Sequence, residues 1–165
     1  MLPAGRLREP PRHLSRADAV VITRADLVDD VSNLRSEISE LNPDAAIFEA
    51  RNELRSIERL NDKTNFEKGT PAFAFCGLGN PDGFFELLKR NNIDVTGRKA
   101  FRDHYAYSQT DIETLENEAR AAQAAVLMTT AKDAVKLGGL KLTLPCYVVD
   151  IQLVLDDPEG FAALL

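Results

Sequence analysis

The sequence predicts an α/β fold, with a mostly parallel sheet in the middle of three layers and helices on both of its faces. Two observations predict it. Short apolar runs, rich in β-branched or aromatic residues, alternate along the chain with segments that have apolar residues at helical spacing. The chain also has 165 residues, of which 44% are apolar and 28% charged, which suits a single compact domain. Strands that alternate with helices favour parallel pairing.

The apolar runs and the periodic segments place the expected elements. Strands are expected at residues 18–23, 45–50, 72–76, 93–101, 125–130 and 145–155. Helices are expected at residues 31–41, 54–60, from Pro81 onward, at 108–122, near 132–137 and after 156–157. Residues 1–17 are rich in Pro and Arg and have no apolar period, so they are expected to form an extended arm or linker, and residues 18–165 the lobe.

Composition excludes several classes of protein. The net charge of -6 argues against non-specific nucleic-acid binding. We find no apolar run near the length of about 20 residues that crosses a bilayer, and no signal peptide. The chain has only two cysteines, Cys76 and Cys146, which are too few for a disulfide framework. Together with His13 and His104 they do not have the spacing of a zinc site, so no bound metal is expected. Cys76 is expected to be a buried small hydrophobe.

Polar residues follow several expected strands, where ligands bind in parallel sheets. The GLGNP segment at residues 77–81 can hold an anion at a helix N-terminus, although a tight strand–helix junction is the favoured interpretation. Residues 129–133, TTAKD, offer two hydroxyls and Lys132 to a phosphate. The favoured alternative is that Thr130 caps a helix and Lys132 is solvated. Residues 23–26 are interpreted as a helix entry.

His104 is the best single candidate for chemistry. Imidazole is the commonest side chain for proton transfer near neutral pH, and the adjacent Asp103 can orient it. Tyr105 and Tyr107 can contact a sugar or close a pocket. The alternative is a loop histidine that hydrogen-bonds the backbone.

Arg8 and Glu9 form a further cluster, in the arm. A guanidinium suits phosphate oxygens, and an adjacent carboxylate can help to place a metal or a hydroxyl. From composition alone, a flexible basic tail is the favoured interpretation.

Several segments in order resemble a known family. They are GRLREP at residues 5–10, RADAVV at 16–21, AFCGLGNP at 74–81, FRDHYAY at 101–107 and TTAKDAVKL at 129–137. Together they resemble the C-terminal half of tetraacyldisaccharide 4'-kinase, the lipid A 4'-kinase. The resemblance runs from about Gly5 to the end of the chain.

The resemblance implies a P-loop-kinase-like lobe of an enzyme at the cytoplasmic face of the inner membrane. That enzyme moves the γ-phosphoryl of Mg-ATP to the 4'-hydroxyl of a tetraacyldisaccharide 1-phosphate, which gives lipid IVA. His104 corresponds to the family's active-site histidine, which supports an aspartate of the other lobe. Arg8 and Glu9 correspond to the Arg-Glu pair near the phosphates, and Asp103 precedes the histidine in the family pattern.

The chain also departs from the family pattern. It has no G-x-x-x-x-G-K-[ST] segment and no D-D-G-F-Q segment, and Ala131 stands where the family has Glu. Because phosphoryl transfer depends on the P-loop Lys and a held Mg²⁺, we expect this chain alone to be inactive and to bind no cofactor. The expected partner is the missing N-terminal lobe, and a homodimer is possible. The alternative function is a freestanding α/β ligand-binding or interaction module derived from that lobe.

Overall fold

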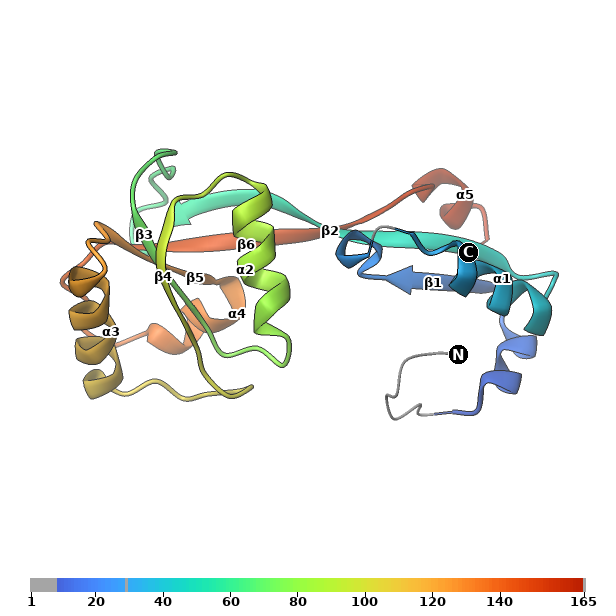
Figure 1. The fold of residues 1–165 in the computed structure, drawn as a ribbon, viewed down its shortest axis with the longest axis horizontal. Helices are drawn as coiled ribbons and strands as arrows, with labels where there is room; N and C mark the ends of the chain where they lie inside the picture. Colours follow the sequence, from blue (N-terminus) through green and yellow to red (C-terminus); the bar gives the residue numbers. More distant parts are fainter. Residues whose placement is uncertain (1–8, 29, 165) are drawn as a thin grey trace. The chain divides into compact units, whose positions relative to one another are not determined.

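The computed structural model describes residues 9–28 and 30–164. By its internal contacts the chain divides into two compact units. The larger is Glu53–Gln152, and the smaller combines Met1–Asn52 with Leu153–Leu165. Two long strands, β2 (Ala46–Arg59) and β6 (Cys146–Leu155), contribute residues to both units (Figure 1).

The sheet of the larger unit is mostly parallel. Its hydrogen-bonded order is β2-β6-β5-β3-β4, where β3 is Ala72–Cys76, β4 is Val95–Ala100 and β5 is Val126–Thr130. The pairs β3–β4, β3–β5 and β5–β6 are parallel. β2 runs antiparallel to β6, since backbone hydrogen bonds join Leu60 to Cys146 and Asp156 to Glu49.

Helices cover both faces of that sheet. Successive residues of β3 point to opposite faces, so β3 contributes side chains to the packing on each of them. Ala72, Ala74 and Cys76 pack in one apolar cluster with α2 (Pro81–Arg90). Phe73 and Phe75 pack in a second cluster with α3 (Gln109–Ala121). The short helices α4 (Ala131–Ala134) and η3 (Val135–Leu137) follow β5. The predicted α/β fold, with its mostly parallel sheet and helices on both faces, is confirmed.

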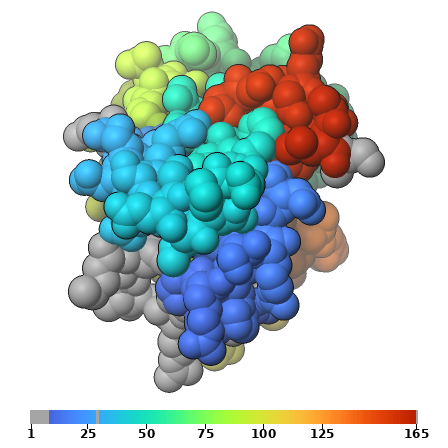
Figure 2. All heavy atoms as spheres, turned by 90° about the vertical axis from the view of Figure 1, so that its right-hand side faces the viewer, coloured from blue at the N-terminus to red at the C-terminus, as the bar shows by residue number. Residues whose placement is uncertain are grey.

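The smaller unit is built on β1 (Ala19–Thr23), which pairs in parallel with the first residues of β2. Arg35, on α1 (Ser32–Leu41), donates from Nε to Glu49 Oε1 on β2 at 3.0 Å. Phe161, on α5 (Pro158–Ala162), meets Phe48 of β2 edge to face at 5.2 Å between ring centroids. In Figure 2 these segments, in blue, cyan and red, pack against one another.

Two expected elements differ in the structure. The prediction of a helix at residues 54–60 is wrong, because β2 continues to Arg59. Exposed and more buried side chains alternate along much of this strand, with the period of two that a strand has. Its pairing with β6 decides this, and that partner lies far away in the sequence. Within the expected arm, Pro11–Arg16 forms a 3-10 helix, η1. Asn42 Nδ2 holds it by donating to the carbonyl oxygens of Leu14 and Ala17 at 2.9 and 2.8 Å.

Ser108 caps α3 in a capping box with Asp111, as the sequence predicts. We therefore expect Ser108→Ala to lower the free energy of unfolding of the larger unit by about 1 kcal/mol. Urea unfolding followed by tyrosine fluorescence measures this, because all three tyrosines lie in the larger unit and the chain has no Trp. Thr114→Ala, within α3 itself, is the control and should leave stability unchanged or slightly raised, since Ala favours a helix. Equal losses in both variants would contradict the assigned cap.

Candidate functional site

A buried carboxylate lies at the centre of the candidate site. Asp133, on α4, is fully buried. Its Oδ2 accepts hydrogen bonds from the backbone N–H of Gly77 at 2.8 Å and from Thr130 Oγ1 at 2.9 Å. Its Oδ1 accepts from Lys136 Nζ at 2.8 Å. Asp133 thus ties the loop that follows β3 to the helix that follows β5.

The electrostatics of this cluster keep Asp133 ionised. Burial raises the pKa of its carboxyl, but the hydrogen bonds from Lys136, Gly77 N–H and Thr130 outweigh burial, and the net pKa lies below its ordinary value. Cys76, which comes just before Gly77, is also fully buried, and burial with the nearby Asp133 charge raises the pKa of its thiol to about 11. The expectation that Cys76 is a buried small hydrophobe is confirmed.

Neighbouring atoms lie close to the backbone of Gly77. A Cβ atom there would lie 3.2 Å from Asp133 Oδ1 and 3.3 Å from both the Arg102 carbonyl oxygen and Tyr105 Cβ. The GLGNP segment is therefore a tight strand–helix junction, pressed against the loop that follows β4 and against α4. Pro81 begins α2, as predicted.

Asp103 and His104 lie on the loop after β4, on the exposed side of this junction. Asp103 Oδ1 accepts from the His104 backbone N–H at 3.0 Å, and Asp103 Oδ2 lies 3.7 Å from His104 Nε2. His104 has a φ of 58°, in the left-handed region that few non-glycine residues adopt, and its side chain is 77% exposed.

Lys132 links this pair to α4. Its Nζ lies 3.0 Å from Asp103 Oδ1, and this hydrogen bond is the main cause of an Asp103 pKa below the ordinary value. Lys132 is 44% exposed, as expected of a solvated side chain, and its pairing with Asp103 is an additional contact that the sequence did not predict. Thr130 does cap α4, accepting from the Asp133 N–H, as expected.

The two tyrosines of the loop have different surroundings. Tyr105 Oη donates to Asp111 Oδ1 at 3.1 Å. Tyr107 is buried in an aromatic group with Phe75, Phe101 and Tyr105. Its hydroxyl has no hydrogen-bond partner among the described residues, and burial and the charge of Asp133 raise its pKa. Tyr107 therefore packs in the core of the larger unit, and its expected contact with a sugar or part in closing a pocket stays a prediction.

The arm residues belong to the smaller unit. Arg8 lies outside the described residues. Glu9 is exposed, and its Oε2 accepts from Arg16 at 2.7 Å and lies 3.1 Å from His13 Nδ1. Within residues 9–28 and 30–164, no group of three or more His, Cys, Asp or Glu side chains is arranged to hold a metal ion. No helix in the same ranges is long and apolar enough to cross a bilayer.

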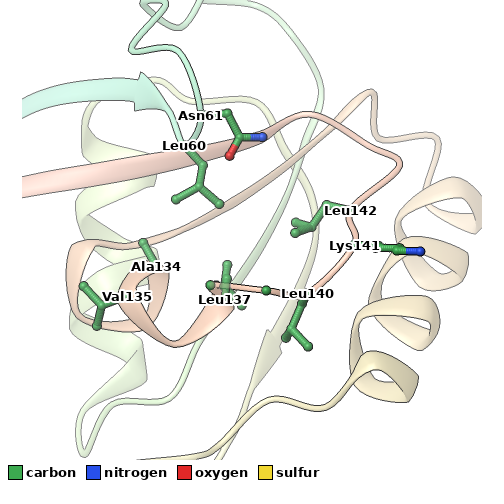
Figure 3. A pocket seen from close by; sticks show the side chains of 10 residues that line it. Leu60, Asn61, Ala134, Val135, Leu137, Leu140, Lys141 and Leu142 are labelled. Carbon is green, nitrogen blue, oxygen red and sulfur yellow. The ribbon is translucent and has the colours of Figure 1, made fainter.

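A separate hollow of about 680 Å³ opens beside α4 (Figure 3). Its apolar lining comes mainly from leucines, with Lys141 at its margin; those leucines are Leu60, Leu137, Leu140 and Leu142. Neither Asp103 nor His104 lines it.

Sequence reasoning missed the central role of Asp133 and the ion pair of Lys136. One signal for Asp133 was available, since a Thr followed three residues later by an acidic residue, directly after a buried strand, is typical of a capped helix. No local signal could show that the same carboxylate also binds Gly77, which lies 56 residues away in the sequence.

The fold and this loop cluster define an α/β protein whose polar residues gather at the carboxyl ends of parallel strands, where such proteins bind ligands. All of residues 1–165 match the model of the family described as Tetraacyldisaccharide-1-P 4'-kinase. The chain belongs to this family, and the resemblance stated from its motifs is confirmed.

Similar proteins agree with the family match. The chain is 36% identical over 166 residues to the tetraacyldisaccharide 4'-kinase of Syntrophobacter fumaroxidans, covering 96% of this chain and 42% of that protein. It is 33% identical over 159 residues to the tetraacyldisaccharide 4'-kinase of Rickettsia rickettsii, covering 96% of this chain and 44% of that protein. A crystal structure of "apo" form LpxK from Aquifex aeolicus in complex with ATP matches with a TM-score of 0.58 at 25% identity, over 99% of this chain and 46% of that one. The chain thus spans less than half the length of these relatives.

Removing the ammonium of Lys132 should raise the pKa of Asp103 toward its ordinary value, because the hydrogen bond from Lys132 is the largest cause of the depression. Carboxyl-detected NMR titration of Lys132→Met measures the shift. Lys89→Met, which removes a lysine paired with Glu86 on α2, is the control and should leave Asp103 unchanged. An unchanged Asp103 titration in Lys132→Met would show that the ion pair does not form in solution.

Asp133→Asn should lower the free energy of unfolding at pH 7 by about 3 kcal/mol, because it leaves Lys136 without its buried counter-charge. Urea unfolding followed by tyrosine fluorescence checks this. The control is Asp150→Asn, whose exposed carboxylate lies 3.6 Å from Arg55 and which should change stability by less than about 1 kcal/mol.

The same carboxylate should make stability depend on pH. The pKa of folded Asp133 lies below the ordinary value of 3.8, so between the two values the unfolded chain binds more protons than the folded one. Its contribution is therefore present above about pH 4 and is lost as the pH falls through the folded pKa. Unfolding midpoints from pH 7 to pH 2 should fall less steeply in Asp133→Asn than in the unaltered chain. Parallel curves would contradict the assignment.

Proposed function

We propose that this chain is the C-terminal lobe of a tetraacyldisaccharide 4'-kinase of lipid A biosynthesis. In the intact enzyme the γ-phosphoryl of ATP moves to the 4'-hydroxyl of tetraacyldisaccharide 1-phosphate, which gives lipid IVA. The observation that carries this proposal is the family match over residues 1–165. The chain also spans less than half the length of its relatives, as a single lobe would. Residues 1–17 would link the lobes, residues 18–165 would form the C-terminal lobe, and the enzyme would work at the cytoplasmic face of the inner membrane.

Within this proposal, His104 and Asp103 are the catalytic pair that this chain supplies. The exposed imidazole has Nε2 within 3.7 Å of Asp103 Oδ2, so it can take up a proton and share the charge with a carboxylate. Lys132 in turn holds Asp103 at 3.0 Å. His104 would thus support the aspartate of the other lobe that deprotonates the sugar hydroxyl.

Arg8 and Glu9 would lie near the phosphates. The surroundings of Glu9 support its part of this proposal. Its exposed carboxylate lies beside Arg16 and His13, so acidic and basic groups are close together in this segment.

The residues of this chain do not fit Mg-ATP by themselves. The sequence has no P-loop, and the described residues hold no acidic cluster suited to a metal. ATP and Mg²⁺ would therefore be bound by the remaining lobe of the enzyme, and we derive no transfer step from this chain alone.

The chain alone should show no turnover with Mg-ATP and tetraacyldisaccharide 1-phosphate. A fusion in which the unmatched part of the Syntrophobacter fumaroxidans kinase precedes this chain should phosphorylate the disaccharide. In that fusion His104→Gln should lower kcat about 10²- to 10⁴-fold, the range of general acid–base contributions. Asp94→Asn, an exposed change at the other end of β4, is the control and should leave kcat unchanged.

Turnover by the chain alone would overturn the proposal that its activity needs the other lobe. A fusion that folds and binds ATP but has no activity would favour the freestanding module instead.

A further inference from the structure

Lys132 joins the exposed pair of Asp103 and His104 to a different part of the fold. It is the second residue of α4, and its Nζ donates to Asp103 Oδ1 at 3.0 Å. On the inner side of α4, the buried Asp133 accepts from the Gly77 N–H at 2.8 Å. Lys132 therefore ties Asp103 to a helix that a buried hydrogen bond joins to the end of β3.

The two oxygens of the Asp103 carboxylate have different partners. Oδ1 accepts from Lys132 Nζ and from the backbone N–H of His104, each at 3.0 Å. Oδ2 lies 3.7 Å from His104 Nε2 and beside Gly79, where an added Cβ atom would lie 3.5 Å from it. Because two donors hold Oδ1, the rotation of the carboxylate is restricted, and Oδ2 is the oxygen that faces the imidazole.

The backbone of His104 depends on the same carboxylate. Its φ of 58° lies in the left-handed region, which is unfavourable for a residue with a Cβ atom. The loop around it is held, since the Tyr105 N–H donates to the Arg102 carbonyl oxygen at 3.2 Å and Tyr105 Oη donates to Asp111 Oδ1 at 3.1 Å. The His104 N–H itself donates to the Asp103 carboxylate. Whatever fixes Asp103 therefore also supports the backbone that carries the imidazole.

We propose that Lys132 is a positioning residue for the Asp103–His104 pair. It holds Asp103 Oδ1, and through this carboxylate it supports the left-handed backbone of His104 and turns Oδ2 toward the imidazole. Lys132 acts on the reaction only through Asp103. Its effect on catalysis rests on the proposed function, but the coupling between Lys132 and His104 belongs to this chain and can be measured without activity.

Backbone NMR of the chain alone measures this coupling. In Lys132→Met, the three-bond HN–Hα coupling and the Cα chemical shift of His104 should move away from left-handed values, because Asp103 loses one of the two donors that hold it. Lys132→Arg keeps a charged donor and should retain most of the signals of the unaltered chain. Lys89→Met, which removes a lysine paired with Glu86 on α2, is the control and should leave His104 unchanged.

The fusion with the unmatched part of the Syntrophobacter fumaroxidans kinase measures the effect on catalysis. Lys132→Met should lower kcat about 10-fold and leave the KM values unchanged, because a misplaced imidazole weakens the transition state and not the binding of substrates. Lys132→Arg should recover most of this loss. In a fusion that already carries Asp103→Asn, adding Lys132→Met should lower kcat by less than about twofold, since Lys132 acts only through Asp103.

Any of three results would overturn the proposal. The first is a Lys132→Met chain in which the His104 signals are unchanged. The second is an active fusion in which Lys132→Met leaves kcat unchanged, and the third is a pair of losses, from Lys132→Met and Asp103→Asn, that simply multiply. An inactive fusion would count against the proposed function instead, and the His104 signals of the chain alone would still decide whether Lys132 positions the pair.

Discussion

The loops of the candidate site depend on the buried carboxylate of Asp133. It accepts hydrogen bonds from the loop after β3, from its own helix cap and from Lys136, so the ends of two neighbouring strands are held by one side chain. A buried charge is tolerated only when it is paired and hydrogen-bonded, and here both conditions are met. Lys132, one residue earlier on α4, then reaches outward to Asp103. Lys132 thus links the exposed Asp103–His104 pair to the helix that carries the buried Asp133.

This arrangement explains why the polar residues of the larger unit form one site although they come from three separate segments. Gly77 permits the close approach of its loop to Asp133 and to the backbone of Arg102. The loop after β4 is therefore packed against two others. His104 has a left-handed backbone there, and the Asp103 carboxylate accepts a hydrogen bond from its N–H.

The smaller unit has a different character. Its helices are joined to β2 by Arg35 and by the contact of Phe48 with Phe161, but its edge strand is apolar and open. Leu153 and Leu164, also in this unit, are 59% and 50% exposed. Surface of this kind agrees with a chain that spans less than half the length of its relatives.

The sequence by itself determined most of the elements, because their signals are local. The apolar run of β3, Pro81 at the start of α2 and the Ser108–Asp111 capping box each act within a few residues, and the ordered motifs were enough to identify the family. Only the tertiary structure decided the features that depend on distant partners. Residues 54–59 are a strand because β6 pairs with them, β1 is an edge because no described strand lies beyond it, and Asp133 is a hub because Gly77 folds back onto it. Hydrogen bonds between residues far apart in the sequence leave no periodic trace in it, and so the centre of the site was visible only once the chain was folded.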